Sequence, residues 1–246
     1  MKRSLILLAG ALLGTVGSAQ AQMSPDLIME NYNNNIQVIT SGIINKSMLD
    51  NAMERNGNGG TSARSKTRAT RPAVSTAYKS TPALRQQTVQ SYANRLKTSN
   101  PSGAQAVTAA FGPGKYDYGH VYRGILDGTG LRDNDAADAL AAYMLMGYAI
   151  VHNIQDGKAI TVPMARGVRA QVAPLLAANS QARGRAAQLG EEMKLQTVIV
   201  QGGWQSAIKE GKLTAYQQSI GQLFKTQYGL DLSQLKLTSQ GFVAGK

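Results

Sequence analysis

The sequence predicts an all-α fold, a bundle of about six to eight helices around one central helix at about residues 135–152. One observation behind this prediction is a stretch of thirteen uncharged residues, 139–151, whose apolar side chains fall on every face of a helix. A helix that is apolar all round is one that other elements surround. The other observation is a series of closely spaced helix start and stop signals between residues 81 and 229.

The central stretch is too short to cross a membrane. A bilayer span needs roughly 20 consecutive apolar residues, whereas Asp138 and His152 bound only thirteen. Asp135 and Asp138 are spaced as a helix N-cap and the residue three beyond it, which predicts that the helix begins here. We therefore expect a core helix, and no transmembrane span in the mature chain.

The segments around the central helix have boundary signals of their own. Residues 81–82, Thr-Pro, are typical of a cap followed by proline in the first turn, and residues 112–114, Gly-Pro-Gly, stop a helix. Pro163 is placed to begin a further helix, which Pro174 should kink or divide. Gly229 stands where a C-terminal cap belongs.

Two further expectations concern the last part of the chain. The longest candidate helix runs toward Lys209, and we expect a break at Gly202-Gly203 because glycine weakens a helix interior. The leucines between residues 230 and 237 form an apolar tail that is too short to stand alone. We expect this tail to dock on the bundle.

Residues 1–21 have the features of an export signal. A basic pair at residues 2–3 is followed by an apolar run at 5–16 and by a small-x-small cleavage site, Ala-Gln-Ala, at 19–21. The sequence thus predicts a mature chain that begins at Gln22 and an exported protein, periplasmic or secreted.

The mature chain divides into three parts. Residues 22–54 form an N-terminal segment with short helical patterns, residues 55–79 a basic flexible linker, and residues 80–242 the helical domain. The linker opens with an Asn- and Gly-rich run and continues as a Ser/Thr-rich run with almost no large apolar residue. The region before the helical domain is expected to be disordered or only loosely docked.

The composition narrows the possible chemistry. The chain has no cysteine, which excludes disulfides, thiolate metal sites and cysteine nucleophiles. Its formal net charge is +12 at pH 7, and two of the positive charges belong to the export signal. A basic surface favours anionic partners such as nucleic acid, lipid headgroups or acidic glycans.

The linker contains six basic and no acidic residues between Arg55 and Lys79. The candidates for polyanion binding within it are Arg64, Lys66, Arg68 and Arg71. A flexible basic arm binds polyanions with a strong dependence on salt. Low-complexity tethers of this kind also serve as solvated spacers, so both roles remain open at this point.

Four aspartates lie within twelve residues: Asp127, Asp133, Asp135 and Asp138. A hard cation such as calcium would need this many oxygen ligands. The spacing fails the helical calcium loop, however, because Arg132 stands where that loop requires glycine. We therefore prefer helix capping, or ion pairing with Arg123, Arg132 or the basic linker, and expect no metal and no other cofactor.

Glu191 and Glu192 raise the question of a cell-wall hydrolase, since two carboxyl groups at set separations cleave sugar polymers. Adjacent helical residues point about 100° apart. These two side chains therefore cannot flank one bond symmetrically, and one of them would need a distant aspartate. We prefer a solvated helix face on which Glu191 lies near Lys194.

The remaining candidates are histidines and tyrosines. His120 and His152 have no metal-ligand spacing, and His152 is expected to hydrogen-bond the last carbonyls of the central helix. Five tyrosines cluster around the central stretch: Tyr116, Tyr118, Tyr122, Tyr143 and Tyr148. They could line a groove, although helical spacing is more typical of partly buried core. No nucleophile elbow or phosphate-binding glycine loop is present.

Three segments carry a resemblance: Gly-Leu-Arg-Asp-Asn-Asp-Ala-Ala-Asp-Ala-Leu-Ala-Ala-Tyr at 130–143, the helix with Glu191-Glu192, and Leu-Lys-Leu-Thr-Ser-Gln-Gly-Phe at 235–242. With them the chain resembles a family of uncharacterised exported bacterial helical proteins with no assigned activity, over about residues 80–242. The resemblance implies a helical domain and export, and supplies no reaction and no site residue.

The function predicted from these observations is that of an exported, non-enzymatic envelope or extracellular interaction protein. Its partner would be an anionic envelope polymer or another envelope protein. One alternative is a cell-wall-directed hydrolase that uses acidic residues. Another is a polyanion-binding protein that acts through the basic linker.

Overall fold

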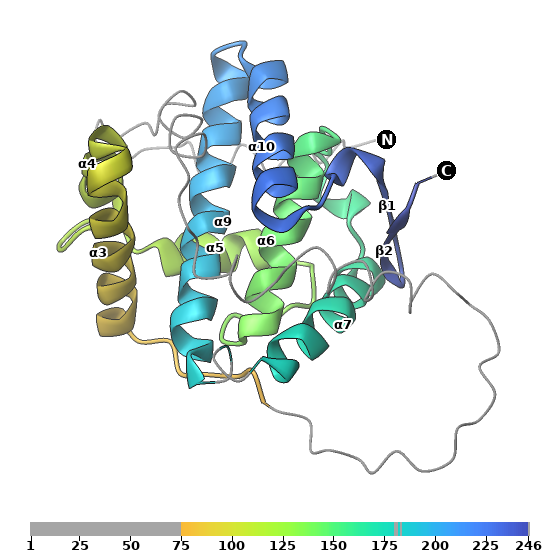
Figure 1. Ribbon diagram of the computed structural model, residues 1–246, viewed down its shortest axis with the longest axis horizontal. Helices are drawn as coiled ribbons and strands as arrows, with labels where there is room; N and C mark the ends of the chain where they lie inside the picture. Colours follow the sequence, from red (N-terminus) through yellow and green to blue (C-terminus); the bar gives the residue numbers. More distant parts are fainter. Residues whose placement is uncertain (1–74, 180–181, 183, 246) are drawn as a thin grey trace, which may run out of the picture.

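The computed structural model describes residues 75–179, 182 and 184–245, and its elements are predominantly helical (Figure 1). The helices are α3 (Pro82–Ser99), α4 (Pro101–Phe111), α5 (Tyr118–Leu126), α6 (Ala136–Val151), α7 (Val162–Ala178), α9 (Ala186–Lys209) and α10 (Leu213–Tyr228). The chain also forms two short 3₁₀ turns, η1 (Gly157–Ala159) and η2 (Leu232–Gln234). A β-hairpin follows, made of strands β1 (Leu235–Thr238) and β2 (Gly241–Ala244). The all-α prediction is confirmed.

Helix α6 begins and ends where the sequence predicted. Asp135 is its N-cap, and the carboxylate accepts hydrogen bonds from the backbone N–H groups of Ala137 and Asp138. All of its residues except Met146 and Val151 are buried. The helix packs against α9, α7 and α10, which accounts for apolar residues on all of its faces (Figure 1).

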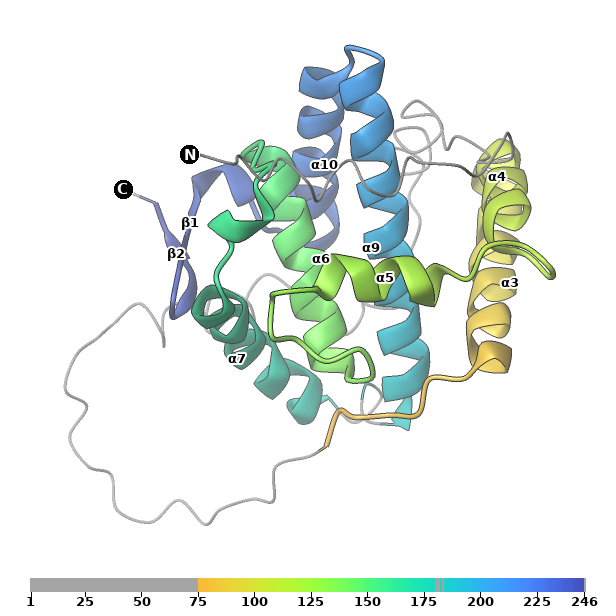
Figure 2. The ribbon, with the colours of Figure 1, turned by 180° about the vertical axis from the view of Figure 1, so that it is seen from behind.

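Helix α9 is enclosed over half of its length. Every residue from 189 to 200 is buried, where the helix packs against α3, α5, α6 and α10. Helix α5 lies across it (Figure 2). The expected break at Gly202-Gly203 is wrong, because α9 continues through both glycines. Packing of the adjacent Trp204 compensates for the weak helix propensity of glycine.

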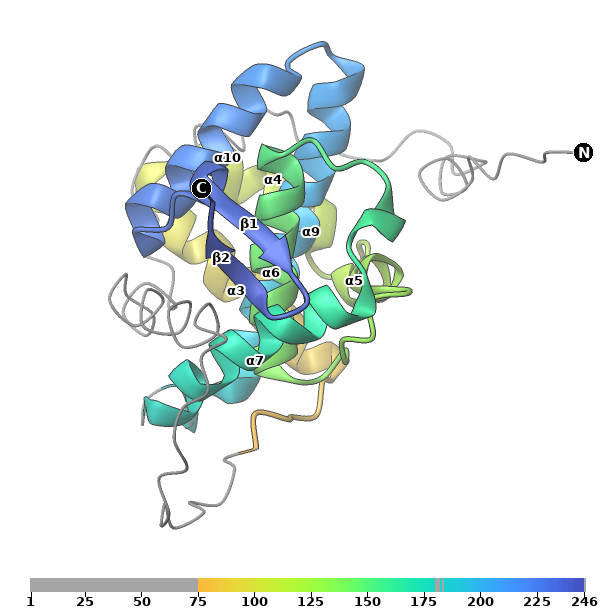
Figure 3. The same ribbon diagram turned by 90° about the vertical axis from the view of Figure 1, so that its right-hand side faces the viewer.

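Helix α7 also continues through its interior proline, Pro174, so the chain is not divided there. The leucine-rich tail docks on the bundle as expected, but it does so partly as a β-hairpin that the sequence analysis missed. The two strands are antiparallel and lie against α7 (Figure 3). The Gln171 amide of α7 donates to the Phe242 carbonyl at 2.7 Å and accepts from the Phe242 N–H at 2.8 Å.

Residues 75–80, which we call the strap, run in extended form into α3. The Tyr78 N–H donates to the Asn134 carbonyl at 3.0 Å, and the Ala136 N–H donates to the Thr76 carbonyl at 2.9 Å. The Thr76 hydroxyl donates to Asp135 at 2.8 Å. The last five residues assigned to the linker, 75–79, are thus hydrogen-bonded to the start of α6.

The rest of the linker, the segment 22–54 and the export signal lie outside the described residues. Within the described part of the chain, no helix is long and apolar enough to cross a bilayer.

Candidate functional site

A group of charged and aromatic side chains is enclosed where α9 meets α5, the strap and the loop before α6. We call it the Lys194 cluster, and it consists of Tyr78, Tyr118, Tyr122, Asp133, Glu191 and Lys194. Lys194 and Glu191 have no exposed surface. Such a group is unusual, because a charge is costly to bury unless it is paired and hydrogen-bonded.

The centre of this cluster is the Lys194 ammonium. Its Nζ lies 2.9 Å from Glu191 Oε1 and 2.8 Å from Asp133 Oδ1. It also donates a longer hydrogen bond of 3.4 Å to the Ser80 hydroxyl of the strap. The rings of Tyr122 and Tyr78 lie 5.4 and 5.7 Å from Nζ, within cation–π range. One cation thus joins α9, the strap and the loop before α6.

Tyr118 completes the coordination of Glu191. Its hydroxyl donates to Glu191 Oε2 at 2.7 Å, while Lys194 contacts the other oxygen. Burial, reinforced by the charge of Glu191 and by this hydrogen bond, raises the pKa of Tyr118 far above its ordinary value. Burial and the charge of Glu191 raise the pKa of Tyr78 in the same direction. Both phenols therefore remain protonated, and Tyr118 remains a donor.

A second ionic group lies beside the first at the start of α6. Arg132 contacts Asp135 at 2.7 Å and Asp138 at 2.6 Å, and Arg169 of α7 contacts both aspartates from the other side. Hydrogen bonding to Asp138, against a smaller opposing effect of burial, raises the pKa of Arg132, so the guanidinium stays charged. Two cations thus neutralise the two buried carboxylates.

The structure separates the four aspartates of the acidic stretch. Asp135 and Asp138 share the two arginines, whereas Asp133 joins the Lys194 cluster. Asp127 is exposed at the end of α5. The capping role of Asp135 and the predicted ion pairing with Arg132 are both confirmed. Within the described ranges, no three His, Asp or Glu side chains are placed to hold a metal ion.

The solvated helix face expected for Glu191 and Glu192 is wrong, because both side chains are buried. Only the predicted proximity of Glu191 to Lys194 is confirmed. Glu191 faces the tyrosines, whereas Glu192 faces α3 and pairs with Arg95 at 2.6 Å. Each carboxylate can be buried because a cation neutralises it, Lys194 of the same helix for Glu191 and Arg95 of α3 for Glu192.

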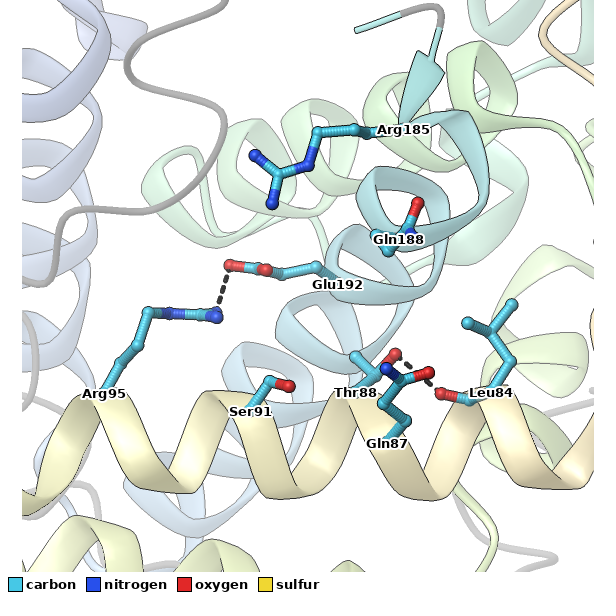
Figure 4. Close-up of a pocket in the computed structure, with 8 residues that line it drawn as sticks. All are labelled: Leu84, Gln87, Thr88, Ser91, Arg95, Arg185, Gln188 and Glu192. Carbon is cyan, nitrogen blue, oxygen red and sulfur yellow. Dashed lines mark hydrogen bonds and ion pairs between the residues drawn. The ribbon is translucent and has the colours of Figure 1, made fainter. Parts of the chain in front are cut away.

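Glu192 and Arg95 border a hollow of about 220 Å³ between α3 and the first turn of α9 (Figure 4). Its other lining residues are Leu84, Gln87, Thr88, Ser91, Arg185 and Gln188. Arg95 and Arg185 both extend toward Glu192, from opposite sides (Figure 4). The hollow is smaller than pockets for drug-sized ligands, which measure about 300–1,000 Å³, so it could hold only a small polar or anionic group.

The remaining candidates are spread through the fold. His120 is exposed, and the ring of His152 contacts the Leu232 carbonyl at 3.0 Å instead of the carbonyls of its own helix. Of the five tyrosines, Tyr116 is 53% exposed. The other four are buried in the hydrophobic core, so these four line no groove. The polyanion-binding candidates Arg64, Lys66, Arg68 and Arg71 lie outside the described residues.

The sequence analysis missed Arg95, Arg169 and Tyr118 as partners of the buried acids. These residues come from three different helices, and no local pattern connects them to their partners. The nearest signal was the charged triplet of Glu191, Glu192 and Lys194, interrupted only by Met193 and followed by apolar residues. A helix with charges on several faces, within an apolar run, indicates ion pairs inside the core.

Comparison with known proteins gives a family and no activity. The model of the family DUF6683, which is described as a family of unknown function, matches residues 1–244 of the chain. No curated protein and no solved structure matches the chain. The predicted resemblance to an uncharacterised family is therefore confirmed, and this chain belongs to the family of unknown function DUF6683.

Proposed function

We propose that the protein is exported and acts by binding an anionic polymer of the cell envelope, without catalysing a reaction. The observation that carries this proposal is the distribution of charge in the folded domain. Four carboxylates are buried, those of Asp135, Asp138, Glu191 and Glu192, whereas Lys194 is the only buried lysine or arginine among the described residues. The exposed side chains are therefore richer in cations than the composition implies, and three of these cations, Arg95, Arg132 and Arg169, pair with the buried acids.

The arrangement of the acids favours binding over hydrolysis. A general acid or base must come within hydrogen-bond reach of the bond that it cleaves. Glu191 is fully enclosed and held by Lys194 and Tyr118, and Glu192 is held by Arg95. These contacts support an architectural role for both glutamates, so the cell-wall hydrolase is the less favoured alternative.

The basic segment 55–79 would be the main contact with the polymer. Its described end is fixed to the start of α6 by the strap, which determines where the segment joins the domain. Its acid-free sequence supports binding through many weak phosphate, sulfate or carboxylate contacts. Export is supported by the signal-like residues 1–21.

The proposal is tested by titrating the mature chain, residues 22–246, with heparin as the anionic probe over a range of salt concentrations. The test variant replaces the four linker candidates with glutamine: Arg64, Lys66, Arg68 and Arg71. The matched control replaces four exposed lysines of the folded domain with glutamine: Lys97, Lys115, Lys158 and Lys209. Both variants lose the same charge, so they separate a local site from the general effect of a basic protein.

The expected result is a steep loss of affinity with salt for the wild type. The linker variant should lower the slope of log affinity against log salt by about 3, because each lost contact contributes about 0.7–0.9. The control should change the slope by less than about 1. Absence of binding by the wild type at low salt, or equal losses in the two variants, would refute the linker as the binding segment.

A further inference from the structure

The Lys194 cluster brings together the three groups that an amide cross-link needs. The amine nitrogen of Lys194 lies 2.8 Å from a carboxylate oxygen of Asp133 and 2.9 Å from a carboxylate oxygen of Glu191. Asp133 belongs to the loop before α6, and the other two residues lie one turn apart on α9. The reacting groups are thus held in contact by the fold, which removes the entropic barrier to a bimolecular step.

The surroundings of these groups exclude water from the contact. Lys194 and Glu191 have no exposed surface, and Asp133 Oδ1 is enclosed although the Asp133 side chain as a whole is 30% exposed. Oδ1 accepts no well-aligned hydrogen bond, so its contact with Nζ is an ion pair only. Two aromatic rings, of Tyr78 and Tyr122, flank the amine.

We propose that Lys194 and Asp133 become joined by an isopeptide bond after the chain folds, with Glu191 transferring the protons. In the first step the Glu191 carboxylate takes a proton from the Lys194 ammonium and passes it to the Asp133 carboxylate. The neutral amine then attacks the Asp133 carboxyl carbon, and a C–N bond forms.

The second step expels water. Glu191 takes another proton from the attacking nitrogen and returns it to a hydroxyl oxygen of the tetrahedral intermediate, whose C–O bond breaks. The balance is one ammonium and one carboxylate converted into one amide and one water, so Glu191 is regenerated and no oxidant, reductant or other reactant is needed. Tyr118, which donates to Glu191 Oε2, leaves Oε1 directed at the amine.

The physical driving force is the removal of two of the three charges in the cluster, those of Lys194 and Asp133. A buried ion pair retains a large desolvation cost, whereas an amide is neutral. The Glu191 carboxylate keeps the hydrogen bond from Tyr118. The product also holds the loop before α6 against α9 in a chain that has no cysteine for a disulfide. Such a covalent cross-link reduces the conformational entropy of the unfolded chain, as a disulfide does.

Intact-mass measurement of the denatured mature chain tests the proposal directly. The wild type is expected to be about 18 Da lighter than its sequence mass, the mass of one water. Trypsin should fail to cleave after Lys194, and tandem mass spectrometry should find the peptide of Asp133 attached to the peptide of Lys194. An unmodified mass together with cleavage after Lys194 would overturn the proposal.

Three substitutions and one control define the chemistry. Lys194→Met and Glu191→Gln should both restore the full sequence mass, whereas Asp133→Asn should lose ammonia, about 17 Da, in place of water. The control, Lys212→Met, removes a lysine from an exposed ion pair with Glu210 at 3.1 Å and should keep the wild-type loss. Because the wild-type spectrum alone decides the question, a variant that fails to fold does not prevent the test.

Loss of water has one competing source in this chain. Succinimide formation at Asp127-Gly128 or Asp156-Gly157 would give the same change in mass. It would place the loss in the peptides of those residues and leave Lys194 open to trypsin. That outcome would overturn the proposal, whereas a cross-linked peptide supports it.

Discussion

Replacing Gly147 by alanine tests the packing of α6 against α10. A Cβ atom at this position would lie 2.4 Å from Cε2 and 2.5 Å from Cζ of Phe224. Favourable carbon contacts begin at about 3.5 Å, so the ring would have to move by about 1 Å. Phe224 is fully buried and packs on the rings of Tyr143 at 5.0 Å and Tyr228 at 5.5 Å, which oppose such a movement.

Two effects of opposite sign determine the size of the change. Overpacking costs about 1–3 kcal/mol, and the rigid surroundings of Phe224 favour the upper end. Alanine gains back about 1 kcal/mol of helix propensity over glycine. We therefore expect a net loss of about 2 kcal/mol, which lowers Tm by about 4–8 °C for a domain of this size.

The assay is thermal unfolding followed by circular dichroism, with Gly202→Ala as the matched control. Gly202 also lies inside a helix, α9, but a Cβ there would meet nothing within 4 Å. The same substitution should therefore raise Tm by about 1–4 °C. A Gly147→Ala variant at least as stable as the wild type would show that Phe224 does not pack on this glycine.

Three further outcomes are expected. Asp138→Asn should lower the free energy of unfolding in urea by about 2–3 kcal/mol, because it weakens the bonds to Arg132 and Arg169. Asp127→Asn, at an exposed position, should change it by no more than about 0.5 kcal/mol. Equal effects of the two substitutions would contradict the assignment of Asp138 to a buried ion pair. Partial burial opposes ionisation of Asp117, but hydrogen bonds from Arg85 and from the backbone outweigh it and lower the pKa of Asp117 below its ordinary 3.8. The stabilisation by this carboxylate is thus complete above the unfolded-state pKa and disappears as the pH falls through the lower folded-state value. The stability difference between wild type and Asp117→Asn, measured by urea unfolding from pH 2 to pH 7, should be constant at the upper end of that range and shrink below about pH 4; a difference independent of pH would contradict the ion pair. Finally, mass spectrometry of the exported chain should find Gln22 at its N-terminus, and Ala21→Arg should block cleavage; an exported chain that still begins at Met1 would remove the signal from residues 1–21.

The sequence alone determined the ends of several helices. Thr81 accepts from the Leu84 N–H, Asp135 caps α6, and Gly229 ends α10 in the left-handed region at φ 65°. These assignments could be made because a cap depends on hydrogen bonds between residues two to four positions apart. The all-α class followed from the same local signals together with the apolar stretch 139–151.

Only the tertiary structure decided the surroundings of Glu191, Glu192 and Lys194. A charged side chain on a helix can be buried when other residues pair with it. Arg95 pairs with Glu192 and Asp133 pairs with Lys194, and neither Arg95 nor Asp133 is near α9 in sequence. Helical periodicity could therefore not predict these buried ion pairs, because it shows which residues share a helix face and does not show what covers that face.

The strap and the hairpin show the same limit for the backbone. Residues 75–79 read as linker because they contain little to bury, yet their N–H and C=O groups pair with the loop before α6. The hairpin docks through the side chain of Gln171, a residue of α7 far away in sequence. Local chemistry thus fixed the ends of several helices. Pairing between distant segments, which satisfies buried charges and extended backbone, determined what the core contains.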